Sequence, residues 1–165
     1  MKREETPFLL GRDTMPTCFF IGHREALDSL LPQLSAAVEH HITELGVTDF
    51  VVGSYGWFDS MAARTVRAAK KHHPEVTLTL LLHYHPYDRP IPTPDGFDST
   101  FYPPGMETVP KRAAIVRANR YMVEHSDYLI SYAWHPASNA RELTEYAKKR
   151  EKKGLIQVTE LSRES

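Results

Sequence analysis

Residues 17–53 read "TCFFIGHREALDSLLPQLSAAVEHHITELGVTDFVVG", and their pattern of apolar residues indicates the class of fold. It opens with "TCFFI" (17–21), a compact β-branched and aromatic run closed by Gly22, which is typical of a buried strand. Apolar residues then recur at three- and four-residue steps up to Gly46, as in an amphipathic helix: Leu27, Leu30, Leu31, Leu34, Val38, Ile42 and Leu45. The run "DFVVG" (49–53) follows. The stretch therefore predicts a strand, a helix and a second strand.

The same alternation continues to residue 161. After "GSYG" (53–56), a second helix is predicted up to Pro74, followed by strands at 76–82, 127–132 and 155–161, with helices from Pro110 and over 138–153 between them. Alternating helices and short apolar strands are typical of a parallel sheet covered on both faces. We therefore predict an α/β fold: a Rossmann-like, doubly wound, five-stranded parallel sheet of order 3-2-1-4-5 with helices on both faces.

The 165 residues suit one domain. We predict an N-terminal arm over 1–15 and a single Rossmann-like domain over 16–165. Within it, residues 83–109 carry eight Gly or Pro positions and several aromatic residues. A connection of that length is uncommon unless it is functional or disordered. We predict a long Pro-rich flap loop that covers a pocket or a dimer partner.

The composition narrows the classes of partner. Twenty basic and 21 acidic residues give a formal net charge of −1, which lacks the electrostatic footprint of a general nucleic-acid or polybasic membrane binder. We therefore expect neither nucleic acid nor a membrane as a partner. The single cysteine, Cys18, cannot form an intramolecular disulfide and suits a reducing compartment. The first 15 residues hold no apolar stretch adequate for a signal peptide, so we expect a cytoplasmic protein.

The predicted strand order also selects a site. The order reverses between the first and fourth strands, and ligands of such sheets bind at the carboxyl ends of the strands on either side of that point. The loops that follow are "GHR" (22–24) and the start of "AWHPASNARE" (133–142), with "GSYGWFD" (53–59) beside them. We expect these three loops to meet at one edge of the sheet.

Each loop offers groups that suit a phosphate-bearing ligand. Gly22 allows close backbone approach, His23 supplies an imidazole, and the Arg24 guanidinium can grip a phosphate with two hydrogen bonds. The second loop places Gly53, Ser54 and Gly56 before a helix N-terminus, whose free N–H groups favour an anion. Asp59 there is either an N-cap or an acceptor for ribose hydroxyls. The third loop supplies Trp134, a stacking, core or interface residue, and the polar residues His135, Ser138 and Asn139.

The sequence names no reaction by itself. No nucleophile elbow, P-loop or complete GxGxxG motif is present. His83 and His85 form the best candidate metal pair, but no third ligand stands at a suitable spacing. We therefore predict no metal site and no cofactor.

Four segments together resemble the SLOG superfamily: "TCFFIGHR", "VVGSYGWFDSMAA", "PKRAAIVRANRYMVEHSDYLISY" and "WHPASNARELTEYAKKRE". The likeness spans about residues 16–160 and is strongest to single-domain bacterial members. This superfamily also contains DNA-processing protein A and the LONELY GUY phosphoribohydrolases. The resemblance implies a Rossmann-like fold, a pocket for nucleotides or nucleotide-derived ligands, and a homodimer.

The resemblance to the LONELY GUY enzymes suggests catalytic candidates. Their Met-x-x-Arg-Lys segment corresponds to the stretch that includes Arg112, and their PGGxGTxxE loop corresponds to "PASNARELT" (136–144). Thr144 stands where that loop has its catalytic Glu, with Glu142 and Glu145 nearby. We therefore favour a protein that binds or senses a nucleotide-like ligand. The alternative is a nucleoside or nucleotide N-glycosidic hydrolase or transferase with Arg112 and Glu142 or Glu145 in catalytic roles, and a third possibility is a DNA-binding partner protein.

Overall fold

The structure, a computed structural model, describes residues 16–54, 56–84 and 92–163. The predicted N-terminal arm, 1–15, lies outside these residues. In chain order the elements are β1 (Thr17–Gly22), the 3-10 turn η1 (Asp28–Leu30), α2 (Leu31–Thr43), β2 (Asp49–Val52), α3 (Trp57–Lys70), β3 (Thr77–Leu81), β4 (Ser99–Phe101), α4 (Lys111–His125), β5 (Tyr128–Tyr132), α5 (Asn139–Glu151) and β6 (Gln157–Glu160).

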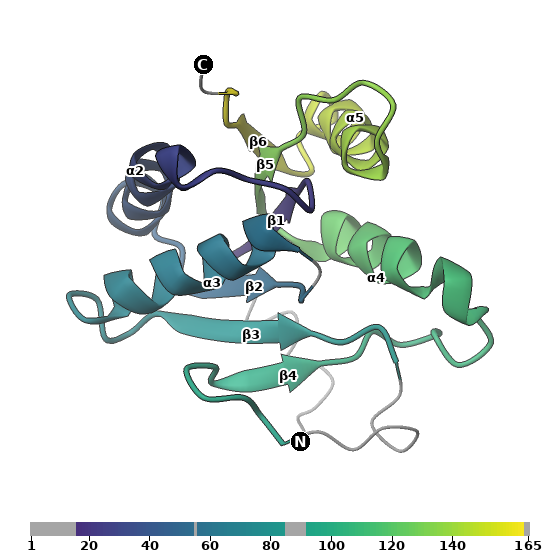
Figure 1. Ribbon diagram of the computed structural model, residues 1–165, viewed down its shortest axis with the longest axis horizontal. Helices are drawn as coiled ribbons and strands as arrows, with labels where there is room; N and C mark the ends of the chain where they lie inside the picture. The colour runs from purple at the N-terminus through teal and green to yellow at the C-terminus, as the bar shows by residue number, and fades with distance from the viewer. Residues whose placement is uncertain (1–15, 55, 85–91, 164–165) are drawn as a thin grey trace.

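The strands form one parallel sheet of order β4-β3-β2-β1-β5-β6 (Figure 1). The predicted α/β class and parallel sheet are confirmed, whereas the predicted five strands and the order 3-2-1-4-5 are corrected to six strands in this order. The addition is β4, which has only three residues and no buried side chain. Such an edge strand lacks the apolar run that marks a buried strand in a sequence. At the middle of the sheet, β1 pairs with both β2 and β5.

Contacts with β3 and α3 hold β4 in place. The Asp98 N–H donates to the Leu78 carbonyl at 2.8 Å, and the Leu78 N–H donates to the Asp98 carboxylate at 2.7 Å. The Lys70 ammonium on α3 lies 2.6 Å from the same carboxylate and lowers its pKa. These partners are distant in sequence, so the local sequence pattern around β4 does not predict the contacts.

β4 therefore lies within the segment 83–109, which was predicted to be a flap loop. Residues 85–91, which include His85, lie outside the described part of the chain. Beyond them, Met106 is buried, and Phe101, Tyr102 and Val109 pack against the core beside it. This part of the segment belongs to the body of the fold.

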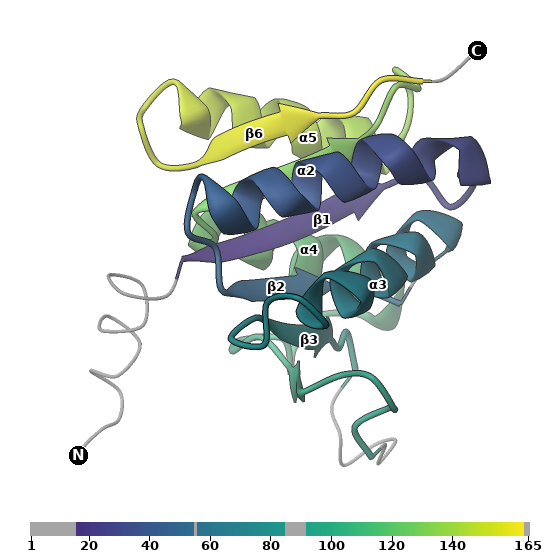
Figure 2. The ribbon, with the colours of Figure 1, turned by 90° about the vertical axis from the view of Figure 1, so that its left-hand side faces the viewer.

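Helices cover both faces of the sheet, as predicted. Figure 2 shows α2 and α3 in front of the sheet and α4 and α5 behind it. A hydrophobic core lies on each face of the sheet, and alternate residues of β1 point into one or the other. Cys18 and Phe20 pack with α2 and α3, and Phe19 and Ile21 pack with α4 and α5. A strand buried on both faces is apolar throughout, which is why "TCFFI" is recognisable in the sequence. Within the described ranges, no helix is both long and apolar enough to cross a membrane.

Candidate functional site

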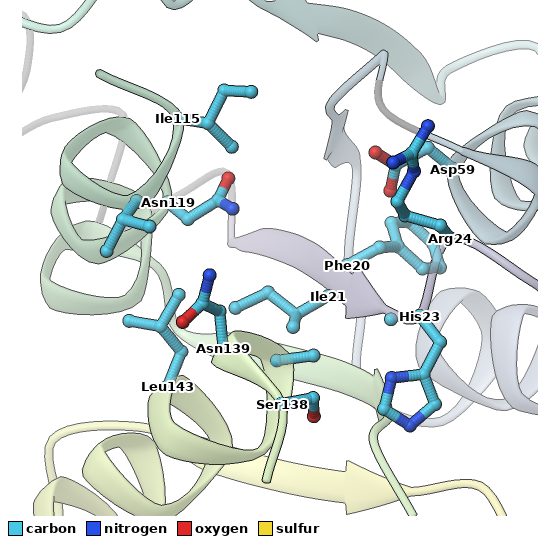
Figure 3. Close-up of a pocket in the computed structure, with 13 residues that line it drawn as sticks. Phe20, Ile21, His23, Arg24, Asp59, Ile115, Asn119, Ser138, Asn139 and Leu143 are labelled. Carbon is cyan, nitrogen blue, oxygen red and sulfur yellow. The ribbon is translucent and has the colours of Figure 1, made fainter. Parts of the chain in front are cut away.

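A cleft of about 280 Å³ opens where the carboxyl end of β1 meets the N-terminus of α5 (Figure 3). The wall opposite α5 is one side of α4, and Asp59 of α3 closes one corner. Its lining residues are Phe20, Ile21, Gly22, His23, Arg24, Asp59, Ile115, Val116, Asn119, Ser138, Asn139, Ala140 and Leu143. Six predicted site residues therefore line one cleft: Gly22, His23, Arg24, Asp59, Ser138 and Asn139.

Ser138 caps the helix that ends at the cleft. Its hydroxyl accepts a hydrogen bond from the Arg141 N–H at 3.0 Å and donates one to the His135 carbonyl at 2.9 Å. The first N–H groups of a helix have no partner within the helix. Those of Asn139 and Ala140 also have none elsewhere among the described residues, and both residues line the cleft. The free N–H groups and the positive end of the helix dipole favour an anion at this point.

His23 joins two of the predicted loops. Its Nε2 accepts a hydrogen bond from the His135 N–H at 3.0 Å, so the proton of the neutral ring is on Nδ1. Burial lowers the pKa of His23, and nearby His135 lowers it further against the opposing effect of Glu25. The imidazole is therefore neutral at pH 7 and holds the β1 loop against the β5 to α5 loop.

The glycines of these loops allow protein segments to pack closely. A Cβ on Gly22 would lie 2.3 Å from the Phe58 ring, and a Cβ on Gly56 would lie 2.5 Å from the Arg24 Cα. The latter contact accompanies a 2.6 Å hydrogen bond from the Trp57 N–H to the Arg24 carbonyl. That N–H group at the start of α3 therefore already has a hydrogen-bond acceptor within the protein. Gly56 also has a φ of 106°, a conformation that favours glycine.

Asp59 and Arg24 lie together at the α3 side of the cleft, and Figure 3 shows their side chains side by side. Asp59 is not the N-cap of α3, because that position is held by Gly56. It lies instead in the first turn, where a carboxylate interacts favourably with the helix dipole. The space beside Gly53 is taken by this carboxylate, whose Oδ2 would lie 3.0 Å from an added Cβ. Arg24 is exposed and also lines two hollows next to the cleft.

The remaining predicted ligand-binding residues lie around the cleft. Ser54 and Gly56 line a hollow on one side of Arg24, and Trp134 and His135 line another. Trp134 is 40% exposed, and the Arg163 guanidinium carbon lies 4.1 Å from the centroid of its ring.

The structure places the catalytic candidates outside the cleft. Arg112 is exposed in the first turn of α4, four residues before Val116 and on the same side of the helix. Glu142 is exposed, and Glu145 pairs with Arg141, which lowers the pKa of its carboxyl. Thr144, at the position of the LONELY GUY glutamate, is fully buried, and its hydroxyl lies 2.6 Å from that of Ser131.

Two residues near the site, Asn119 and Arg163, are not among the predicted site residues. Asn119 projects its amide into the cleft from α4 (Figure 3). Its place beside Val116 on one helix face was a usable signal, because residues three apart share a face. Arg163 follows the last strand, and nothing in its local sequence indicates its contact with Trp134. Among the described residues, no group of three or more His, Cys, Asp or Glu side chains could hold a metal ion.

Comparison with solved structures gives a likeness in fold. No protein-family model and no curated protein matches the chain. A solved structure of DNA processing protein A from Helicobacter pylori, described for its single-stranded DNA binding mode, aligns with a TM-score of 0.52. The alignment covers 93% of this chain and 78% of that one, at 14% identity. The fold resembles that of DNA processing protein A.

This likeness supports the fold implied by the SLOG resemblance and corrects one expectation. We predicted from the net charge of −1 that nucleic acid is not a partner. DNA processing protein A has a similar fold and binds single-stranded DNA, so the charge argument does not hold for a fold of this kind. Net charge sums over the whole surface, whereas binding depends on charge at the site.

Proposed function

We propose that the cleft binds a nucleotide or a nucleotide-derived ligand, and that the protein is a binder or sensor of this ligand. One observation carries the proposal: the capped N-terminus of α5 and the Arg24 side chain border the same cleft at the centre of the sheet. Unpaired helix N–H groups and a guanidinium are two of the donors that proteins use to hold phosphate.

The walls of the cleft suit the remainder of a nucleotide. Ile115 and Val116 on one side and Leu143 on the other provide apolar surface for a sugar or base. The amides of Asn119 and Asn139 provide both donors and acceptors between these walls. Apolar walls with a few polar groups are typical of small-molecule sites.

Binding accounts for the site better than N-glycosidic hydrolysis does. That reaction needs a carboxylate or another acid-base group within hydrogen-bonding reach of the sugar. Glu142 and Glu145 do not line the cleft, and Glu145 is paired with Arg141. Asp59 does line it, but its carboxylate lies beside Gly53 on the far side from α5.

Single-stranded DNA is a second candidate ligand, favoured by the fold likeness to DNA processing protein A. Trp57 and Trp134, both exposed, line the hollows on either side of Arg24. Aromatic rings combined with basic side chains suit single strands, since bases stack on the rings while the cations meet the phosphates. Fluorescence anisotropy of a labelled oligothymidylate tests this candidate: saturable binding that Trp57→Ala weakens supports it, and no binding at 50 mM salt contradicts it.

Thermal denaturation with a panel of nucleotides tests the primary proposal. A ligand present at one hundred times its Kd adds about 2.7 kcal/mol, or roughly 5–10 °C in Tm for a domain of this size. The panel holds nucleoside mono- and diphosphates, NAD and ADP-ribose. We expect a shift that Arg24→Ala reduces, with Lys152→Ala, at the far end of α5, as the charge-matched control. No shift with any of them at millimolar concentration would refute the proposal.

A further inference from the structure

The hollow lined by Trp134 and His135 has a volume of about 570 Å³ and adjoins the cleft. The two spaces share His23, Arg24 and Ser138, so one ligand could extend from the cleft into the hollow. Trp134 and Arg163 are present only in the lining of the second space. Glu25 is the one acidic residue in the described lining, and it is exposed.

The segment after β6 brings Arg163 to this hollow through two anchors. The Leu161 N–H donates to the Ser131 carbonyl at 2.7 Å, at the end of β5. The Gln33 amide on α2 then holds the Ser162 backbone from both sides: it donates to the carbonyl at 3.1 Å and accepts from the N–H at 2.6 Å. The backbone on the N-terminal side of Arg163 is thus fixed by residues far away in the sequence.

The resulting contact leaves the guanidinium able to bind an anion. Its carbon lies 4.1 Å from the centre of the Trp134 ring. An arginine on an aromatic ring uses its flat face there, and its N–H donors radiate from the edge of the guanidinium group. Arg163 and Arg24 therefore both line a hollow into which their side chains can donate hydrogen bonds.

We propose that this hollow is a second phosphate subsite, completed by Arg163 and held in common with Arg24. The inference rests on the proposed function and names the ligand class more closely: a nucleotide that carries at least two phosphate groups. Arg24 lines both spaces, which suits phosphates that are neighbours in one molecule. The chemistry is shared by a free nucleoside diphosphate or pyrophosphate-linked dinucleotide and by successive phosphates of a single strand.

Calorimetric titration at 0.15 M salt tests the inference with AMP, ADP, ADP-ribose and the dinucleotide pTpT. We expect ADP to bind the wild-type protein about tenfold more tightly than AMP, the effect of one charge-assisted hydrogen bond. Arg163→Ala abolishes that difference and leaves AMP binding unchanged. Gln33→Ala, which releases Ser162 but retains the guanidinium, reduces the difference in the same direction. Lys152→Ala removes a distant positive charge and leaves both affinities unchanged.

The four ligands separate the possible outcomes. Preference for ADP and ADP-ribose assigns the subsite to pyrophosphates, and preference for pTpT assigns it to the phosphates of a strand. Equal binding of all ligands, or an equal loss of AMP and ADP binding in Arg163→Ala, would overturn the second subsite while the proposed function stands. Failure of every ligand to bind the wild-type protein would overturn both.

Discussion

Replacing Gly22 with alanine tests how the β1 end of the cleft is built. The new Cβ would lie 2.3 Å from Cδ2 and 2.4 Å from Cγ of Phe58. The Phe58 ring cannot move freely, because it is fully buried and stacks on Tyr132 with ring centres 5.9 Å apart. Overpacking a rigid core costs about 1–3 kcal/mol, and each kcal/mol lowers Tm by about 2–4 °C at this size. We therefore expect Gly22→Ala to lower Tm by roughly 2–12 °C.

A double-mutant cycle shows whether Phe58 causes this loss. Leucine at position 58 is smaller than phenylalanine and can turn its branch away from residue 22. Urea denaturation of Gly22→Ala, Phe58→Leu and the double variant should give a coupling energy of about 0.5–3 kcal/mol, with Gly22→Ala less harmful in the Phe58→Leu background. Additive losses, or a Gly22→Ala variant as stable as the wild type, would show that the Phe58 ring does not restrict the space beside Gly22.

Three further predictions concern other buried or capping residues. His41 is fully buried with Nε2 unpaired among the described residues, and burial lowers its pKa from 6.5. Since the unfolded state then binds more protons at acid pH, the contribution of His41 to the free energy of unfolding should level off above about pH 6.5 and fall below it by up to about 1.4 kcal/mol per pH unit. Urea titrations should show a weaker fall in His41→Phe. Burial likewise raises the pKa of the Cys18 thiol, so iodoacetamide at pH 8 should label it only as fast as the protein unfolds; rapid labelling of the native state would contradict this. Ser138→Ala should cost about 1 kcal/mol by loss of the N-cap, whereas Ser138→Asp should keep the stability and weaken nucleotide binding by repulsion, both measured by thermal denaturation with and without ADP.

The sequence predicted those parts of the fold that leave a local pattern. β1 is buried on both faces and therefore apolar along its length, and α2 shows its buried side as a three- and four-residue repeat. β4 leaves no such pattern, because it is held by pairing with β3 and by the contacts of the preceding residue, Asp98, with Leu78 and Lys70. Short edge strands of this kind depend on tertiary contacts.

The candidate site likewise combines features that could be predicted from the sequence with features that depend on tertiary contacts. Topology alone placed the ends of β1 and α5 together, because an order reversal in a parallel sheet creates a crevice there. The role of Gly22 could not be predicted, because the sequence does not show whether a glycine leaves space for a ligand or for a protein side chain such as Phe58. Arg163 could not be predicted at all, as its position depends on the Gln33 amide, 129 residues before Ser162.

Blocking the cleft with a bulky side chain tests whether the nucleotide binds there. Val116 is 40% exposed on α4 and lines the cleft, so Val116→Trp adds a large ring there without removing a core residue. Arg117→Trp adds the same ring at an exposed neighbouring position that does not line the cleft. In calorimetric titrations with ADP at 0.15 M salt, we expect Val116→Trp to bind at least about tenfold more weakly than the wild type and Arg117→Trp to bind normally. Wild-type affinity in Val116→Trp would contradict the claim that the nucleotide binds in this cleft.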